Sequence, residues 1–210
     1  MPFDLPYGTL LSYSPRSDSE LAQKAKLVCG RIKSGDPAFI KSAIEKLSEP
    51  PCSALRSVLG NDVTLVPVPR SAPLVQGAVW PSKIIADLLV HYGYGEQTMT
   101  LINRVSAVPK SSSSAPENRP SVEQHYQSLE VLAGDLFSPP KIALVDDVLT
   151  QGRTTIACAR RLMEVYHAAE IKVFAMVRTL GFTELNQIVD PAVSKIKYYA
   201  SGKTFRCDPD

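Results

Sequence analysis

Several common functional signatures are missing from this chain of 210 residues. Its four cysteines are widely scattered and form no Cys-x-x-Cys pair, so the sequence gives little support for a zinc site or a disulfide framework. The three histidines are also dispersed, which gives no support for a shared metal or catalytic role. Neither Gly-x-x-x-x-Gly-Lys-Ser/Thr nor Gly-x-Gly-x-x-Gly occurs, which argues against the corresponding nucleotide-binding loops.

The charge of the chain is nearly balanced, with 23 Lys and Arg against 21 Asp and Glu. A net charge of +2 does not support a dedicated nucleic-acid surface, although a local basic loop can still bind phosphate. No apolar run approaches the length of a membrane span, and the first residues do not form a basic, apolar leader. We therefore expect a cytoplasmic protein with no membrane partner.

Strand and helix patterns alternate through most of the chain. A strand over 63–68 is followed by a helix beginning at Pro81 and a strand over 98–102, and a second such unit covers 142–177. A last strand is expected over 195–199. Because 44% of the residues are apolar, a sizeable core is possible. The pattern predicts an α/β fold with a mainly parallel, twisted sheet flanked by helices.

The first residues have a different pattern. Ser17-x-x-Glu20 is typical of a helix start, and Asp36-Pro37 is a second, with apolar residues at helical spacing after each. Tyr7 to Tyr13 has the composition of a short strand. We expect an N-terminal helical extension over residues 1–60 that packs against a main domain over residues 61–210.

A segment over 103–140 interrupts the alternation. It contains four consecutive serines, several prolines and three spaced basic residues, namely Arg104, Lys110 and Arg119. A connection of this length is usually functional or disordered, so a closing lid or hood and a flexible surface loop are about equally favoured. A helical turn over 121–125 and a strand over 129–132 are expected within it.

The most informative stretch is residues 142–155. A buried apolar strand ends at Asp146-Asp147, a small-residue turn carries Thr150 and Gly152, and a helix follows from Thr154. The first N–H groups of a helix lack intrahelical partners, and the helix dipole favours an anion there. Two carboxylates can accept hydrogen bonds from adjacent sugar hydroxyls. The order of these features favours a ribose-phosphate site.

Two other interpretations of this stretch remain open. It is also compatible with an ordinary strand-to-helix turn in which Thr154 caps the helix. An acidic pair after a strand also occurs where Mg²⁺ is held, as in receiver or phosphatase sites, but those sites need further acidic residues and a lysine that the sequence does not place.

The stretch resembles the signature of the type I phosphoribosyltransferases, in which an apolar strand precedes Asp-Asp-x-x-Thr-Thr-Gly-x-Thr. Here the signature runs from Val145 to Thr154, and Gln151 stands where the family usually has threonine. The resemblance implies a phosphoribosyltransferase-like fold. It also implies that Thr150, Gln151, Gly152, Arg153 and Thr154 hold a 5-phosphate.

The likeness extends from about residue 63 to residue 179 and is nearest to the ComF-like branch. Val66-Pro67-Val68-Pro69-Arg70 resembles the pyrophosphate loop of that branch, Arg104 and Arg119 resemble its basic loop positions, and residues 175–180 resemble its later strand. The chain departs from the branch in two respects. It has no cysteine-rich N-terminal module, and residues 76–80 replace the usual Arg-Gly-Phe-Asn run.

The resemblance implies a ligand, a cofactor and a set of roles. The ligand is 5-phosphoribosyl 1-pyrophosphate or another ribose phosphate, with Mg²⁺ as the cofactor. Asp146 and Asp147 would hold the ribose hydroxyls directly or through Mg²⁺, which makes them the catalytic and metal-binding candidates. Arg70 and Ser71 would face the pyrophosphate, and Arg104 is a further ligand-binding candidate that could close from the lid.

Two functions follow from the resemblance. The first is transfer of phosphoribose to a nucleobase-like acceptor in nucleotide metabolism, with release of pyrophosphate. The second is a non-catalytic module of the same fold that binds the metabolite and acts on a protein or DNA-processing partner. The resemblance also suggests a homodimer. Three aromatic residues are candidates for stacking on an acceptor, although packing in the core is the stronger interpretation for each: Trp80, Tyr126 and Phe182.

Overall fold

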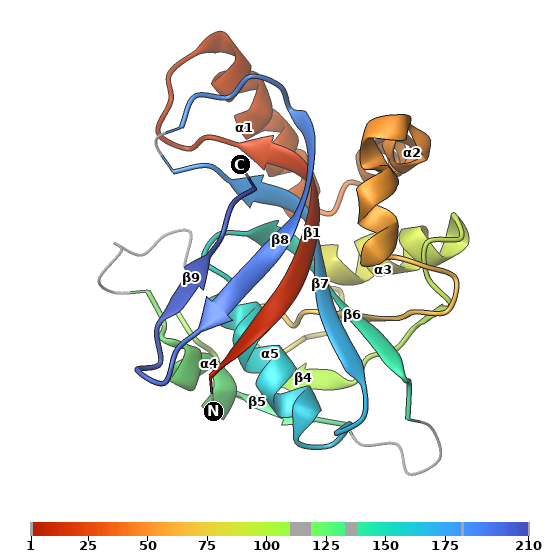
Figure 1. Ribbon diagram of the computed structural model, residues 1–210, viewed down its shortest axis with the longest axis vertical. Coiled ribbons are helices and arrows are strands. Elements are labelled where there is room, and N and C mark those ends of the chain that lie inside the picture. Colours follow the sequence, from red (N-terminus) through yellow and green to blue (C-terminus); the bar gives the residue numbers. More distant parts are fainter. Residues whose placement is uncertain (1, 110–118, 133–137, 182, 210) are drawn as a thin grey trace.

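A computed structural model describes residues 2–109, 119–132, 138–181 and 183–209 (Figure 1). The elements in chain order are β1 Phe3–Tyr13, α1 Glu20–Lys33, α2 Pro37–Glu45, the 3-10 helices η1 Lys46–Ser48 and η2 Pro50–Ser57, β2 Thr64–Pro67, α3 Pro81–His91, β3 Gln97–Thr98, β4 Ile102–Arg104, α4 Val122–Gln127, β5 Leu129–Val131, β6 Lys141–Leu149, α5 Arg153–Met163, β7 Glu170–Thr179, β8 Val189–Tyr198 and β9 Thr204–Arg206.

The main sheet has seven strands in the order β3-β2-β6-β7-β1-β8-β9, and β4 and β5 form a separate two-stranded sheet. The strands from β3 to β1 are parallel, whereas β8 and β9 add antiparallel pairs at one side. The predicted α/β class, with a mainly parallel sheet flanked by helices, is therefore confirmed.

Helices cover both faces of the central strands. Successive side chains of a strand point to opposite sides, so they contribute to two different cores. In β6, Ala143 and Val145 belong to the core that includes side chains of α1, α2 and α3. Ile142 and Leu144 belong to the other core, with side chains of α4, α5 and the small sheet. Figure 1 shows α5, α4 and the β4–β5 sheet near the end of the molecule opposite α1 and α2.

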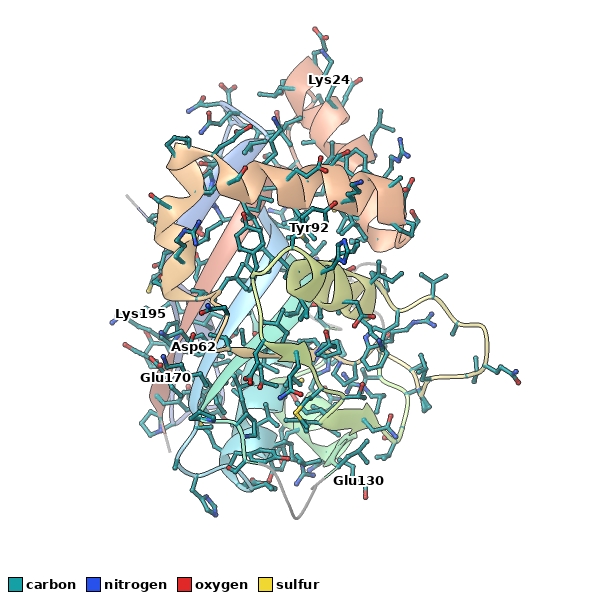
Figure 2. The ribbon with its side chains drawn as sticks, turned by 90° about the vertical axis from the view of Figure 1, so that its right-hand side faces the viewer. Lys24, Asp62, Tyr92, Glu130, Glu170 and Lys195 are labelled. Atoms are coloured by element: carbon teal, nitrogen blue, oxygen red, sulfur yellow. The ribbon has the colours of Figure 1, made fainter. Side chains whose placement is uncertain are left out.

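Figure 2 shows the helical layer at one end of the molecule, with Lys24 at its tip, and the β4–β5 sheet, marked by Glu130, at the other end. Tyr92 lies between α3 and the helices above it and packs against the first core. None of the helices in the described part of the chain is both long and apolar enough to cross a bilayer.

The N-terminal residues differ from the expected helical extension. The short strand expected over Tyr7 to Tyr13 begins at Phe3 and lies inside the main sheet, parallel to β7 on one side and antiparallel to β8 on the other (Figure 1). The residues that the sequence pattern missed are those from Phe3 to Pro6, where Pro6 interrupts the strand-like composition. The Cα of Gly8 faces η2, where a Cβ would lie 2.9 Å from Leu55 Cδ2, so the glycine permits close packing there.

Other boundaries differ more modestly. Helix α2 begins after Asp36 as expected, but the N-cap of α1 is Ser19 rather than Ser17. The strand expected over 98–102 is divided between β3 and β4, and β9 has no counterpart in the sequence analysis. The boundary that matters most for the site is that of β6, which continues through the acidic pair as far as Leu149.

Candidate functional site

A cleft of about 1070 Å³ opens at the carboxyl ends of β2, β6 and β7. This is the edge at which open α/β sheets bind ligands. Eight of the ten residues singled out from the sequence line it, namely Arg70, Ser71, Arg104, Asp146, Asp147, Thr150, Gln151 and Thr154. The other two, Gly152 and Arg153, line a small adjoining hollow of about 90 Å³ that Asp146, Thr150 and Thr154 share.

The acidic pair lies in strand β6 rather than beyond its end. Asp146 Oδ1 accepts a hydrogen bond from the backbone N–H of Asp147 at 2.9 Å, and Asp147 Oδ1 accepts one from Val148 N–H at 2.9 Å. The hydroxyl of Ser82, at the start of α3, is 3.5 Å from Asp146 Oδ1. These contacts orient both carboxylates.

The two carboxyl groups have different surroundings. Desolvation raises the pKa of Asp146 well above its usual range, and the neighbouring charge of Asp147 adds to this shift. Both side chains are half-buried in the cleft wall. A cation or a hydroxyl donor placed between them would favour the charged form of Asp146, so the pair is suited to a ligand that offers one of these groups.

The turn after β6 exposes main-chain donors. Within the described residues, the backbone N–H groups of Gln151, Gly152, Arg153 and Thr154 have no hydrogen-bond acceptor. Arg153 and Thr154 begin α5, Gly152 is its N-cap and Gln151 precedes the cap, so the helix dipole also favours an anion at this end. The turn therefore has the donor arrangement of a phosphate site, next to the hollow of about 90 Å³.

Gly152 is the N-cap of α5 and has φ of 72°, in the left-handed region. A Cβ at this position would lie 2.5 Å from Ile196 Cδ1 of β8. The turn therefore needs glycine for two reasons: its backbone conformation and its close approach to the side chain behind it. Thr154 does not cap the helix, in contrast to the simplest interpretation of the sequence.

Arg104 is not a solvated lid residue. Only 2% of it is exposed, and its guanidinium donates to the carbonyls of Arg70 at 2.9 Å and His125 at 3.4 Å, and to the Ser128 hydroxyl. It therefore joins the loop after β2 to the segment that carries α4. One side of this buried group reaches the cleft wall, so its contribution to the site is a fixed positive charge.

His125 enters the site from α4, although no role was expected for it from the sequence. It is buried, it lines the cleft, and its Nε2 lies 3.3 Å from Thr154 Oγ1 in the phosphate-type turn. The pKa of His125 is lowered to about 4, mainly by burial and also by the neighbouring positive charges of Arg104 and Arg153. The imidazole is therefore neutral at pH 7 and can orient the threonine hydroxyl.

The loop between β2 and α3 forms another wall. Arg70 is exposed and Ser71 is half-buried at the cleft, and Ser71 O accepts a hydrogen bond from Val108 N–H at 2.8 Å. The indole N–H of Trp80 donates to Val68 O at 2.8 Å, which holds the loop closed. This bond gives Trp80 a structural contact, and the residue is not among those that line the cleft.

The N-terminal segment supplies a wall that the sequence analysis assigned to packing alone. The end of β1 and the end of α1 border the cleft through five residues: Tyr13, Pro15, Arg16, Lys33 and Ser34. Of the other stacking candidates, Tyr126 lies under the guanidinium groups of Arg160 and Arg161, outside the cleft. Lys110 and Phe182 lie outside the described residues.

Positive charge is concentrated at this edge of the molecule. Among the described residues, two carboxylates and six basic side chains line the cleft, the basic ones being Arg16, Lys33, Arg70, Arg104, Arg119 and Arg206. The chain as a whole carries a net charge of only +2. The excess in the cleft therefore favours a ligand with several negative charges.

Neither a cluster of metal ligands nor a match to a known protein adds to this description of the cleft. Within the described residues, no group of three or more His, Cys, Asp or Glu side chains is placed to hold a metal ion. Compared with protein-family models and with curated proteins, the chain has no match. The chemical interpretation of the cleft therefore depends on its own residues.

Proposed function

We propose that this protein binds 5-phosphoribosyl 1-pyrophosphate and transfers its phosphoribose group to a nucleobase-like acceptor. One observation carries the proposal. The free N–H groups after β6, the carboxylates of Asp146 and Asp147, and the guanidinium of Arg70 all face one cleft. A monophosphate, a pair of adjacent hydroxyls and a pyrophosphate require these three kinds of group.

Each part of the donor has a counterpart in the cleft. The 5-phosphate would lie on the main-chain N–H groups of residues 151–154. The ribose hydroxyls would donate to the carboxylate oxygens of Asp146 and Asp147. Arg70 and Ser71 would bind the pyrophosphate, since a guanidinium matches phosphate geometry with two parallel hydrogen bonds.

The proposed reaction breaks the bond between the anomeric carbon and a pyrophosphate oxygen, and it forms a bond from that carbon to an acceptor nitrogen. Positive charge develops on the ribose ring, so the task of the protein is positioning and charge stabilisation rather than covalent catalysis. Asp146 and Asp147 lie where they can stabilise that charge. Arg70 can stabilise the negative charge on the departing pyrophosphate.

A single magnesium ion fits this proposal, although the described residues supply no complete metal cage. Mg²⁺ is often bound by one or two carboxylates together with water and substrate phosphates. Asp146 and Asp147 provide such a pair beside the proposed pyrophosphate position. When bound, Mg²⁺ would neutralise part of the pyrophosphate charge and make it a better leaving group.

Asp147→Asn tests the proposal, with Asp87→Asn as a matched control. Asp87 pairs with Lys83 on the exposed side of α3 and does not line the cleft. We expect the native chain to gain thermal stability with the donor and Mg²⁺ and to release pyrophosphate with at least one nucleobase. Asp147→Asn should reduce donor affinity and the rate of pyrophosphate release by about tenfold or more, whereas Asp87→Asn should leave both unchanged.

The alternative is a binding module of the same class without chemistry. Gln151, exposed at the cleft where the phosphoribosyltransferase signature that this stretch resembles usually has threonine, favours this candidate because a hydroxyl is missing from the phosphate turn. Donor-induced stabilisation with no pyrophosphate release across a panel of nucleobases would support it and reject the enzyme. Absence of any donor-induced stabilisation would reject both candidates.

A further inference from the structure

The C-terminal hairpin lies directly behind the phosphate-type turn. Ile196 of β8 fills the space next to the Cα of Gly152, and Arg206 of β9 pairs with Ile196 across the hairpin. The Arg206 side chain is nearly buried, with 8% exposed. Two neighbouring residues of one hairpin therefore contact the same turn from behind.

Arg206 binds the main chain of two site loops. Its Nη1 donates to Leu149 O at 3.0 Å and to Thr150 O at 2.8 Å, and its Nη2 donates to Thr179 O at 2.6 Å. Both Leu149 and Thr150 precede the free N–H groups, and Thr179 ends the neighbouring strand β7. The guanidinium thus joins the ends of β6 and β7 at the point where the cleft begins.

The far side of the guanidinium is held by the tail. Arg206 pairs with Asp208 at 2.8 Å, and the hydroxyl of Tyr7 donates to Cys207 O at 2.7 Å and lies 3.4 Å from Asp208 Oδ1. The buried β1 strand therefore anchors the residues after β9. This arrangement keeps Arg206 in one orientation, so its donors are pre-organised for the loop carbonyls.

We propose that Arg206 is a positioning residue for the phosphate turn, and that the C-terminal hairpin is a functional part of the anion site. The C=O and N–H of one peptide plane point in opposite directions. Holding the Leu149 and Thr150 carbonyls against Arg206 therefore presents the N–H groups of Thr150 and Gln151 to the opposite side. This proposal rests on the proposed function, because it takes the turn as the site of the 5-phosphate.

A purely structural role predicts a different pattern of contacts. An arginine that only attached β9 to the sheet would bind β8, whereas the loop acceptors of Arg206 belong to β6, β7 and the turn between β6 and α5. Its positive charge also lies behind the proposed phosphate position and lines the cleft. The hydrogen bonds to the loop carbonyls and the positive charge therefore both favour anion binding at the turn.

The test uses the full chain and two probes that occupy different parts of the cleft. Ribose 5-phosphate reports on the phosphate turn, and inorganic pyrophosphate reports on the Arg70 wall. Calorimetry on Arg206→Lys should show ribose 5-phosphate affinity falling about tenfold or more, with pyrophosphate affinity within about twofold of the native value. Arg161→Lys is the control, because Arg161 also binds a carbonyl and a carboxylate but lies outside the cleft.

The outcomes separate this inference from the proposed function. Equal ribose 5-phosphate affinity in the native chain and in Arg206→Lys overturns the inference and leaves the proposed function intact. Native protein that binds neither probe overturns both. An equal loss of both affinities in Arg206→Lys, with a lowered melting temperature, indicates a structural role and also overturns the inference.

If Arg206→Lys does not fold, Asp208→Asn provides the second variant. It keeps the arginine but removes the carboxylate that orients it. We expect a smaller, selective loss of ribose 5-phosphate affinity of about two- to fivefold. No selective loss in this variant overturns the inference.

Discussion

At the residue scale, the site depends on positions where one residue meets two structural requirements. Gly152 meets a backbone demand through its positive φ and a packing demand through its contact with Ile196. His125 meets the demands of a core position and of a hydrogen bond to Thr154. Substitutions of these residues should therefore change stability by amounts that the residue type alone would not predict.

Gly152→Ala should destabilise the protein by about 2 kcal/mol, because it adds left-handed strain and forces a Cβ against Ile196. Chemical denaturation measures the free energy of unfolding. The matched control is Gly30→Ala in α1, where a Cβ meets no atom within 4 Å and helix propensity predicts a gain of about 0.5–1 kcal/mol. When Ile196→Ala is already present, Gly152→Ala should cost less stability, because the clash with Ile196 is removed and only the backbone strain remains. Equal effects of the two glycine substitutions would contradict this account.

His125 should make the protein less stable in mild acid. Its folded pKa of about 4 lies below the ordinary value of 6.5, so the unfolded chain binds the extra proton first. Stability contributed by the neutral imidazole is complete above pH 6.5 and is lost as the pH falls toward 4. The loss amounts to roughly 3 kcal/mol.

The measurement for His125 compares denaturation of the native chain and of His125→Gln at several pH values. The raised pKa of Asp146 acts with the opposite sign, because the folded carboxyl retains its proton at higher pH. Asp146 is present in both chains, so the difference between the two stability curves isolates His125. Parallel curves from pH 7 to pH 4.5 would refute the prediction.

At the element scale, β1 is the central finding. It lies between β7 and β8 and supplies side chains to both cores, including Leu5 and Leu10. The Arg178–Asp190 ion pair at 2.5 Å and the bond from Ser12 Oγ to Asp190 at 2.7 Å connect the same three strands. The N-terminal segment therefore helps to build the sheet as well as the cleft wall.

A chain beginning at residue 61 should not fold cooperatively, because removing β1 opens the sheet between β7 and β8 and exposes both cores. Thermal unfolding followed by circular dichroism should show no sigmoidal transition for residues 61–210. Adding a fragment of residues 1–60 should restore one. A cooperative transition in the shortened chain alone would show that the main domain is independent of this strand.

At the scale of the whole molecule, charge is distributed unevenly. In the part of the chain that the structure describes, the cleft carries six basic and two acidic side chains, on a protein that is close to neutral overall. Such a distribution attracts a polyanion to one edge without making the remaining surface strongly cationic. It agrees with the expectation from composition that any phosphate-binding region would be local.

Affinity for inorganic pyrophosphate should therefore fall as salt rises, by about tenfold between roughly 0.05 and 0.5 M potassium chloride. Isothermal titration calorimetry at constant pH measures this dependence. Arg70→Gln should reduce both the affinity and its salt dependence, since it removes one charge from the wall. Affinity that does not change with salt would argue against electrostatic attraction by the cleft.

Local sequence patterns determined much of the central architecture. Apolar runs predicted β2, β6 and β7, and the proline at its start together with helical spacing predicted α3. The same patterns placed Asp146, Asp147 and the turn around Gly152 at one sheet edge. These features were readable because each depends on residues that are close together in the chain.

The tertiary structure decided which distant residues join that edge. Strand pairing and helix packing bring three distant parts of the chain to the cleft, namely Arg206, His125 and the end of α1. For the same reason Arg104 is buried and hydrogen-bonds to the loop after β2. The periodic spacing of apolar residues along the chain does not show which residues tens of positions apart will be in contact. The sequence by itself therefore specified the phosphate-type turn, whereas the three-dimensional fold decided what supports it, because those contacts depend on chain topology rather than on neighbouring residues.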